Sequence, residues 1–278
     1  MVTGCKPPWI RVRVGQSETF QTTAGRLRAH GLHTVCEEAA CPNMGHCWAQ
    51  GRATILILGD RCTRGCRFCN VDKRPVLPPD PGEPGRVAAA VRETGLKEVV
   101  ITSVTRDDLP DGGAALWAAT VRAVREAMPG VLVEVLVPDF GGDPGSIDTV
   151  IQTRPAVFGH NLETVPRFYA RVRPEADYTR SLNVLRQSAA AGLATKTSLM
   201  LGLGETMEEV QAVMRDARDA GCGIFYAGQY LQPTPRHEPV ARYLDPSEFD
   251  TLRDTAHALG FTRVASAPLI RSSYHTQP

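Results

Sequence analysis

The sequence predicts an α/β fold, a partial (βα)6 barrel of the TIM type with an N-terminal and a C-terminal extension. From Thr54 onward, apolar runs rich in β-branched residues recur six times, and segments with helical apolar spacing separate them. Continuous apolar strands are typical of a sheet that helices cover, and alternation of strands with helices favours parallel pairing. For 278 residues with six such units, a curved, incomplete barrel fits well. A doubly wound open sheet is the structural alternative.

The expected elements of the barrel can be read in order. Strands are expected at 54–59, 97–103, 131–138, 156–163, 195–204 and 223–231. Helices are expected at 87–93, 114–128 and 182–191, and a strongly periodic one begins at Thr206. The five prolines of residues 74–85 indicate a stiff, irregular connection. Since proline is favoured in a first helical turn, the first helix is expected to start near Pro84 to Arg86.

Three segments make up the expected domain organisation. Residues 1–53 do not follow the repeat, and we expect an extension wrapped on the barrel, which itself spans 54–245. Residues 246–278 form the C-terminal extension, with a helix at 246–259, a short strand at 261–266 and a polar tail. One catalytic domain with extensions is therefore expected, and not two domains.

Composition and charge narrow the class of protein. With 42% hydrophobic and 22% charged residues, the chain is typical of globular proteins, and its net charge of +1 gives no global field that would recruit nucleic acid or an anionic membrane. No apolar run approaches the roughly 18 residues of a membrane span, and the N-terminal segment lacks the apolar core of a signal peptide. A cytoplasmic location is expected. There, clustered cysteines favour metal binding over disulfides.

Six of the eight cysteines form two triplets, and the second triplet is the more informative. The first has the spacing C-x4-C-x5-C at Cys36, Cys41 and Cys47, and the second has C-x3-C-x2-C at Cys62, Cys66 and Cys69. Three thiolates within eight residues can hold three irons of a cubane iron–sulfur cluster. The fourth iron then has no protein ligand, and open coordination sites are where metals do chemistry. We therefore expect an enzyme.

The second triplet follows the first expected strand, on the face where α/β barrels place their active sites. Its spacing, with Phe68 before the last cysteine, resembles that of the radical S-adenosylmethionine enzymes. The resemblance implies a 4Fe-4S cluster whose fourth iron binds S-adenosylmethionine, and an electron from the cluster that generates a 5′-deoxyadenosyl radical. A structural zinc knuckle is the alternative, but the spacing is not the C-x2-C pair that is usual in zinc sites.

The first triplet has looser spacing, and His46 beside Cys47 leaves a Cys3His zinc site as an alternative. The surrounding segments resemble the lipoyl synthases, in family order and over nearly the whole chain. They are KPPWIRVR (6–13), CEEAACPNMGHCW (36–48), TSVTRDDLPDGG (102–113), HNLETVPR (160–167), LMLGLGET (199–206), GQYLQPTPRHEPV (228–240) and RSSYH (271–275).

The resemblance implies a second, auxiliary 4Fe-4S cluster on the first triplet. Its fourth ligand would be a serine of RSSY, Ser273, with Ser272 as the fallback. A hard alkoxide should leave iron more readily than a thiolate, which would free an iron and expose a bridging sulfide. Read without the resemblance, the tail is a polar C-terminus that frays.

The implied reaction inserts two sulfur atoms at the sixth and eighth carbons of an octanoyl chain on a lysine of a carrier protein, with the auxiliary cluster as sulfur donor. The implied partners are the octanoylated H protein of glycine cleavage and the E2 subunits of 2-oxoacid dehydrogenases. A flavodoxin or ferredoxin would donate electrons, and an iron–sulfur cluster carrier would serve the clusters. No nucleic-acid or membrane partner is expected.

Further candidate residues end the expected strands, and each has a structural alternative. Thr102 and Ser103, with Arg106 and Asp107 after them, end the second strand, although this stretch also has the composition of a turn. Candidates to contact S-adenosylmethionine are Thr102, Ser103, Asn161, Glu163, Gly202 and Glu205. For Asn161 and Glu163 the alternative is a helix cap, and for Glu205 or Thr206 it is also a capping role. Gly202 and Gly204 could allow close backbone approach to a ligand.

Other residues are less specific. Tyr230, Gln232, Arg236 and His237 could contact the protein substrate or tune the auxiliary cluster, or they could belong to a solvated proline-rich loop. The remaining cysteines, Cys5 and Cys222, are expected to be a terminal thiol and a buried apolar residue. Two rival functions stay open: another radical enzyme with two clusters, such as an RNA methylthiotransferase, and a zinc-stabilised binding protein without catalysis.

Overall fold

A computed structural model describes residues 6–10, 18–39, 41–50, 53–95 and 97–273. The chain forms two compact units. One, the N-terminal unit below, consists of residues 12–64 and 70–158, and the other, the C-terminal unit, of residues 1–11, 65–69 and 159–278. These units are defined by contacts within the fold. The expected domains, 1–53, 54–245 and 246–278, are defined by sequence patterns, and that division stays a proposal. Cys5 lies outside the described residues.

The sheet of the N-terminal unit is parallel apart from its first strand. β2 (Thr54–Ile57), β3 (Glu98–Ser103) and β4 (Leu132–Leu136) pair in parallel, with Ile55 opposite Ile101 and Ile101 opposite Val135. The strands are buried, which matches their continuous apolar sequences. The two-residue β1 (His33–Thr34) pairs with β2 in antiparallel orientation. This short strand was not predicted, because two residues carry no periodic pattern.

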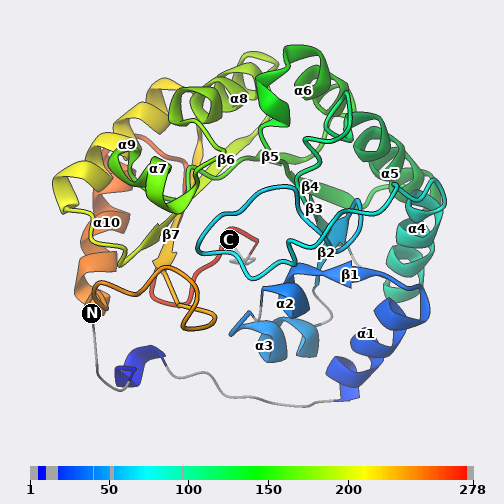
Figure 1. Cartoon of the computed structure of the whole chain (residues 1–278), viewed down its shortest axis with the longest axis horizontal. Coiled ribbons are helices and arrows are strands. Elements are labelled where there is room, and N and C mark those ends of the chain that lie inside the picture. Colours follow the sequence, from blue (N-terminus) through cyan, green and yellow to red (C-terminus); the bar gives the residue numbers. More distant parts are fainter. Residues whose placement is uncertain (1–5, 11–17, 40, 51–52, 96, 274–278) are drawn as a thin grey trace. The chain divides into compact units, whose positions relative to one another are not determined.

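Helices α4 (Glu83–Thr94), α5 (Ala114–Ala127) and α6 (Pro144–Ile151) lie along the outside of β2 to β4 (Figure 1). In α5, Trp117, Val121 and Val124 recur at helical spacing and are fully buried. α4 has a proline in its first turn, as expected, and ends at Gly95, whose φ of 67° is the left-handed conformation of a helix C-cap.

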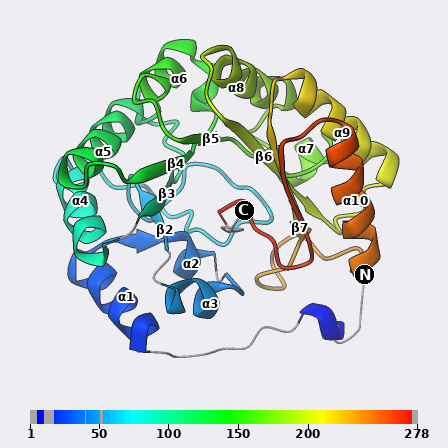
Figure 2. The same ribbon diagram turned by 180° about the vertical axis from the view of Figure 1, so that it is seen from behind.

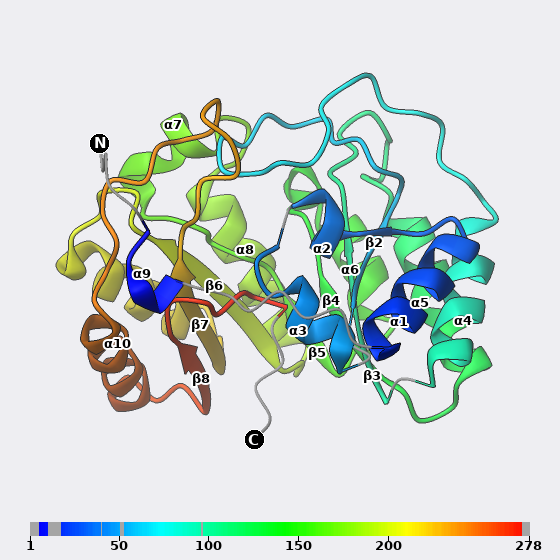
Figure 3. The same ribbon diagram turned by 90° about the horizontal axis from the view of Figure 1, so that it is seen from below.

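The N-terminal segment is more helical than predicted. It forms α1 (Glu18–Ala29), α2 (Val35–Glu38) and α3 (Met44–Ala49), and Figure 3 shows α1 beside α4. The rings of Phe20 and Trp48 lie 5.2 Å apart between centroids, which joins α1 to α3. α1 was missed because it is mostly polar, with only Thr23, Ala24 and Leu27 buried.

In the C-terminal unit, β6 (Thr195–Leu201), β7 (Ile224–Gln229) and β8 (Arg263–Ser266) pair in parallel. Figure 2 shows α8 (Tyr178–Ala190), α9 (Met207–Asp219) and α10 (Pro246–Ala258) on the outside of these strands. Single-turn elements complete the fold: η1 (Pro8–Ile10), η2 (Phe140–Gly142), η3 (Pro166–Phe168) and α7 (Tyr169–Val172).

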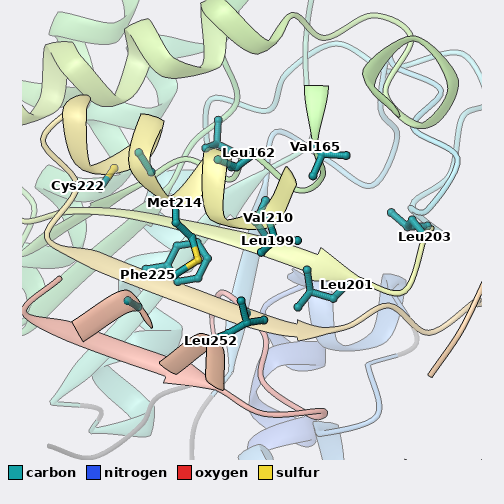
Figure 4. Packing of buried hydrophobic residues seen from close by; sticks show 14 of the residues in the cluster. Leu162, Val165, Leu199, Leu201, Leu203, Val210, Met214, Cys222, Phe225 and Leu252 are labelled. Carbon is teal, nitrogen blue, oxygen red and sulfur yellow. The ribbon is translucent and has the colours of Figure 1, made fainter. Parts of the chain in front are cut away.

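The core of the C-terminal unit lies between its strands and helices (Figure 4). Leu199 and Leu201 from β6 and Phe225 from β7 pack with Met214 of α9 and Leu252 of α10. Cys222 is also in this core and burial raises its thiol pKa to about 12, so it is the buried apolar residue that the sequence predicts.

The strand order runs from β1 to β8 along the chain, with β5 (Val157–Gly159) after β4 and with β1 and β8 as the two end strands. The predicted α/β class and partial barrel are therefore confirmed. The fourth expected strand, 156–163, is wrong in length, because β5 ends at Gly159 and Glu163 has a φ of 66°, which ends an extended conformation. In the described part of the chain, no helix is long and apolar enough to cross a membrane.

Candidate functional site

The second cysteine triplet occupies the loop that follows β2. A left-handed turn opens this loop, with φ of 67° at Leu58 and 91° at Gly59. Glu83, the first residue of α4, accepts a hydrogen bond from Leu58 N at 2.8 Å. Burial raises the pKa of Glu83, and hydrogen bonds from Leu58 and Gly59 oppose this effect. The turn directs the chain away from β2 and into the cysteine loop.

Cys62 is held by backbone hydrogen bonds at both its amide and its sulfur. Its N–H donates to Asp72 O at 2.8 Å. Its Sγ accepts from the N–H groups of Arg64 at 3.5 Å and Thr105 at 3.3 Å. Hydrogen bonds to a cysteine sulfur orient it and tune the reduction potential of an iron–sulfur cluster bound to it. The cysteines of both triplets are free thiols, so no disulfide competes with metal binding.

Arg64 anchors the first half of the loop inside the N-terminal unit. Its Nε and Nη2 donate to both oxygens of Asp107 at 2.7 and 2.8 Å, and Nη2 also donates to Asp139 Oδ1 at 2.6 Å. The Arg64 side chain is 6% exposed and that of Asp139 is fully buried. Burial alone would lower the pKa of Arg64, but the hydrogen bonds to Asp107 and Asp139 raise it above its ordinary value.

The second half of the loop, with Cys66 and Cys69, belongs to the C-terminal unit. Cys69 N donates to Cys66 O at 3.2 Å, which closes a tight turn. Arg67 N donates to Val172 O at 2.8 Å, and Gly65 N donates to Glu175 Oε1 at 3.2 Å. The backbone around these cysteines is thus held by Val172, the last residue of α7, and by Glu175 after it.

The segment after β7 holds the same part of the loop. His237 Nε2 lies 3.1 Å from Cys69 O, and its Nδ1 lies 2.8 Å from Thr234 Oγ1. Glu238 N donates to Arg67 O at 2.9 Å, and Tyr230 OH donates to Glu238 O at 2.7 Å. Gln232 Nε2 donates to His237 O at 2.9 Å, whereas Arg236 is exposed. His237 is therefore a contact of the cysteine loop and not a solvated loop residue.

The candidates at the end of β3 already have protein partners. Thr102 Oγ1 donates to Leu136 O at 2.7 Å, and Ser103 Oγ accepts from Trp117 Nε1 at 3.1 Å. Arg106 is 2% exposed and donates from Nε and Nη2 to the two oxygens of Asp108 at 2.8 Å each. These residues brace the strand end, and Ser103 is the one whose hydroxyl still has a proton to donate.

Asn161 and Glu163 follow β5 and lie together in the C-terminal unit. Asn161 Nδ2 donates to Glu163 Oε1 at 3.0 Å. Enclosure by protein atoms raises the pKa of Glu163, and the nearby Arg173 guanidinium and Asn161 amide oppose this effect. Asn161 Oδ1 is buried without a hydrogen-bond partner. Neither residue caps a helix, because η3 has Val165 at its N-cap, so the capping alternative is wrong.

The candidates after β6 make contacts within the protein. Both oxygens of Glu205 accept backbone hydrogen bonds, from Gly202 N at 2.6 Å and Leu203 N at 3.0 Å. A Cβ at Gly202 would stand 2.1 Å from Gln229 Nε2, so the space beside this glycine is filled by Gln229. Thr206, and not Glu205, caps α9. These contacts give Gly202 and Glu205 a structural role.

The first triplet lies in the N-terminal unit, with Cys36 in α2, Cys47 in α3 and Cys41 in the connection between them. Cys36 is buried in α2 and burial raises the pKa of its thiol, whereas Cys41 and Cys47 are partly exposed. Cys41 N donates to Cys36 O at 3.0 Å, so the chain turns back between the first two cysteines. His46 Nε2 lies 3.1 Å from Gln50 Nε2 on an exposed helix face.

The C-terminal tail is docked up to the serines. Gln229 N donates to Pro268 O at 3.1 Å, and Ile270 N donates to Ala267 O at 3.0 Å. Ser272 and Ser273 form a turn and are partly buried, while Tyr274 and the residues after it lie outside the described part. The alternative that the last ten residues fray does not hold for Ile270 and Arg271, which make hydrogen bonds to Ala267 O and Pro268 O.

Among the residues described here, no three histidine, cysteine, aspartate or glutamate side chains are gathered as a metal site. The donor set nevertheless fits iron–sulfur clusters in its chemistry, since it offers free thiols, and two backbone donors are directed at Cys62 Sγ. Sequence reasoning missed Arg64, Asp139 and Arg173. Arg64 stands inside the C-x3-C motif, which was its one local indication.

The comparisons with known proteins identify the family. Residues 56–217 match the radical SAM superfamily. A lipoyl synthase of Chlorobaculum parvum is 50% identical over 277 residues, covering 99% of this chain and 94% of that protein. One of Trichlorobacter lovleyi is 54% identical over 273 residues, covering 97% and 96%.

A solved structure of methylornithine synthase (PylB) has a TM-score of 0.57 and covers 94% of this chain and 82% of its own. At 14% identity, this likeness shows the fold alone. Membership rests instead on the sequence relatives, which match the whole length of the chain. The chain belongs to the lipoyl synthase family of the radical SAM superfamily.

Proposed function

We propose that this enzyme inserts two sulfur atoms at the sixth and eighth carbons of a protein-bound N6-octanoyl-lysine, with an auxiliary 4Fe-4S cluster as sulfur donor. The observation that carries the proposal is about 50% identity to lipoyl synthases over 99% of the chain, with both cysteine triplets present. The carbon–hydrogen bonds of an octanoyl chain are too inert for acid–base chemistry at neutral pH, so sulfur insertion needs a radical route.

In this proposal, Cys62, Cys66 and Cys69 hold the cluster that meets S-adenosylmethionine. Bound there, the cluster supplies the electron that cleaves S-adenosylmethionine and yields the hydrogen-abstracting radical. The backbone N–H groups of Arg64 and Thr105 would hold Cys62 Sγ in place as a cluster ligand. On the protein side, His237 orients the Cys69 peptide group by its contact with Cys69 O.

S-adenosylmethionine would be bound by groups at the strand ends. The candidates differ in whether their polar atoms already have hydrogen-bond partners within the protein. The Asn161 amide oxygen and the Glu163 carboxylate are suited to a ribose hydroxyl or an amino group, since Asn161 Oδ1 is a buried acceptor without a partner. Ser103 could donate its hydroxyl proton. The role of Thr102, Gly202 and Glu205 would be indirect, because their polar groups stabilise the backbone at the strand ends by hydrogen bonds.

The auxiliary cluster would be held by Cys36, Cys41 and Cys47, with Ser273 as the fourth ligand and Ser272 as the fallback. Docking of residues 267–271 on β7 supports a defined place for the serine turn. The division into an N-terminal extension (1–53), a barrel (54–245) and a C-terminal extension (246–278) assigns these ligands to the two extensions.

The protein substrates would be octanoylated lipoyl-carrier domains, namely the glycine cleavage H protein and the E2 subunits of 2-oxoacid dehydrogenases. A flavodoxin or ferredoxin would supply electrons, and an iron–sulfur cluster carrier would rebuild the auxiliary cluster. A cytoplasmic location is part of the proposal, because exposed thiolate ligands need reducing surroundings.

The test is product formation on a defined substrate. Anaerobically reconstituted full-length protein, S-adenosylmethionine, dithionite and an octanoyl-lysine peptide should yield a lipoyl-lysine peptide, detected by mass spectrometry. A protein that binds both clusters and cleaves S-adenosylmethionine, but never adds sulfur to this peptide or to an octanoylated H protein, would contradict the proposed function.

A further inference from the structure

We propose that Arg64 is a positioning residue that sets the direction of the two backbone N–H groups aimed at Cys62 Sγ, through its anchorage on Asp107 and Asp139. This inference deepens the proposed function, because Cys62 is there a ligand of the reactive cluster. All residues that carry it lie in the N-terminal unit.

Arg64 is tied to Cys62 by its own backbone. Its N–H is one of the two donors to Cys62 Sγ, at 3.5 Å. Its guanidinium is fixed by three hydrogen bonds of 2.8 Å or less to two carboxylates. A planar guanidinium with such contacts has little freedom to rotate. The backbone N–H of Arg64 is therefore held in a fixed direction as well.

The second donor is tied to the same anchor. Thr105 N donates to Cys62 Sγ at 3.3 Å, and Asp107 follows two residues later in the same loop. Asp107 N donates to Thr63 Oγ1 at 3.1 Å, and Thr63 N donates to Thr105 O at 3.1 Å. The two segments that supply the donors are thus joined at Thr63, directly beside Cys62.

Asp139 provides the rigid end of the arrangement. It is fully buried and accepts from Gly141 N at 3.1 Å, which caps the turn after β4. In that turn Phe140, Gly141 and Gly142 have φ of 48°, 64° and 84°. A positive φ at a bulky residue such as Phe140 costs energy, and strain of this kind is retained where a special position of the chain is needed. The strained turn places Asp139 beneath Arg64.

The experiment uses full-length protein in which Cys36, Cys41 and Cys47 are replaced by Ala, so that only the cluster on the second triplet can bind. The variants are Arg64→Lys, which keeps the charge and loses the planar fork, and Asp139→Asn. The control is Arg86→Lys, which disrupts another anchored arginine of the N-terminal unit, whose guanidinium donates to Asp80 Oδ2 at 2.6 Å and to His30 O at 3.1 Å. Thermal unfolding of each protein without iron reports on general structural damage.

Two readouts are compared. In the protein without iron, amide hydrogen exchange of the peptides containing Arg64 and Thr105 should be about tenfold faster in Arg64→Lys and Asp139→Asn than in the background and in Arg86→Lys. In the reconstituted protein, release of iron to a chelator should be faster by about 10- to 100-fold in the same two variants, as is typical when the support of a metal ligand is lost. The double variant should match the single ones, because both act on one anchor.

The outcomes separate this inference from the proposed function. Unchanged amide exchange in Arg64→Lys and Asp139→Asn, or equal acceleration in Arg86→Lys, would overturn the inference whether or not iron binds. Faster exchange confined to the two variants, in a protein that takes up no iron, would support the positioning role of Arg64 and would count against the proposed function instead.

Discussion

The carbonyl oxygen of Ile270 lies 2.0 Å from the position that a Cβ on Gly228 would take. Gly228 is in β7, and the segment after β8 continues alongside this strand, with Ala267 N donating to Ala227 O at 3.2 Å and Gln229 N donating to Pro268 O at 3.1 Å. Only a glycine allows this approach. The relationship explains why the segment that leads to the serine turn is docked.

Gly228→Ala should destabilise the protein. The new Cβ would meet the backbone oxygen of Ile270, which cannot move aside as a flexible side chain can. The tail or the strand must therefore shift. We expect a loss of about 1–3 kcal/mol in the free energy of unfolding, the usual cost of overpacking. Chemical denaturation of the purified protein measures it. In activity assays, sulfur insertion should fall more than cleavage of S-adenosylmethionine, because the displaced segment leads to Ser273.

Gly85→Ala is the matched control for this prediction. Gly85 lies in α4, and nothing stands within 4 Å of the position of its Cβ. Alanine should stabilise the helix there by roughly 0.5–1 kcal/mol. If Gly228→Ala is as stable as Gly85→Ala, the tail does not dock on β7 in solution as it does here.

The two cysteine triplets should be separable by iron content. Anaerobically reconstituted wild-type protein should hold two 4Fe-4S clusters, and replacing Cys62, Cys66 and Cys69 by Ala should leave one. Iron and sulfide analysis measures both. Protein purified anaerobically that contains stoichiometric zinc, no sulfide, and takes up no cluster would contradict this prediction.

The same variants should divide the chemistry. Without the second triplet, the protein should not form 5′-deoxyadenosine, because the open iron is assigned there. Without Cys36, Cys41 and Cys47, it should still cleave S-adenosylmethionine but form no lipoyl product. Chromatography of 5′-deoxyadenosine distinguishes the two. Normal sulfur insertion in the variant of the first triplet would reverse the assignment.

An acid-sensitive contribution to stability should come from Glu209. Hydrogen bonds from Arg167 and from Thr206 N lower its pKa to about 2 from an ordinary value of 4.5. A carboxyl whose pKa is lowered in the folded state stabilises the fold above its unfolded pKa, and this contribution is lost as the pH falls from about 4.5 towards 2. The stability difference between wild type and Glu209→Gln should therefore be constant at neutral pH and shrink over that window.

Urea denaturation at several pH values measures this difference. The effect should be small and should weaken in high salt, since Arg167 is half exposed and surface pairs are screened. Gln at this position can still complete the capping box of α9, so the comparison with Glu209→Gln reports on the charge of Glu209 alone. A difference that grows as the pH falls would show that the lowered pKa is wrong.

The features that sequence predicted are the local ones. Thr206 was one of two candidate caps, the strongly periodic helix expected from it is α9, and the helix expected at 114–128 is α5, so these local patterns were predicted without the structure. The cysteine spacing indicated the site and the family, and the relatives confirmed the enzyme class over its two rivals. These patterns need no knowledge of how distant segments meet.

The features that were missed depend on distant contacts. The anchor of Arg64 on Asp139 joins residues 75 positions apart, and no local pattern marks either partner. β2 ends at Ile57 and not at Gly59, because the chain turns at Leu58. There the Leu58 N–H donates a hydrogen bond to the Glu83 carboxylate. Likewise, Gly202 was expected to make room for a ligand, but Gln229 from β7 fills that space.

The role of Ser273 as fourth ligand of the auxiliary cluster is the one that depends most on family resemblance. If its oxygen is a ligand of the auxiliary cluster, Ser273→Ala should abolish or severely impair sulfur insertion and leave cleavage of S-adenosylmethionine intact. Ser273→Cys should also be damaging, although thiolate binds iron well, because a ligand that does not leave keeps the iron closed and its sulfides less available.

Ser272→Ala is the matched control, since both serines lie in the same partly buried turn. A role limited to the surface predicts little effect from any of these changes, because surface substitutions usually alter stability by only about 0.5 kcal/mol. The measurement is the yield of dithiolated octanoyl-lysine peptide under dithionite, with 5′-deoxyadenosine quantified in the same reaction. A near-wild-type yield from Ser273→Ala together with loss in Ser272→Ala would move the ligand by one residue. Full yield in both would remove the tail from the mechanism, and the docking of Ile270 on Gly228 would then serve stability alone.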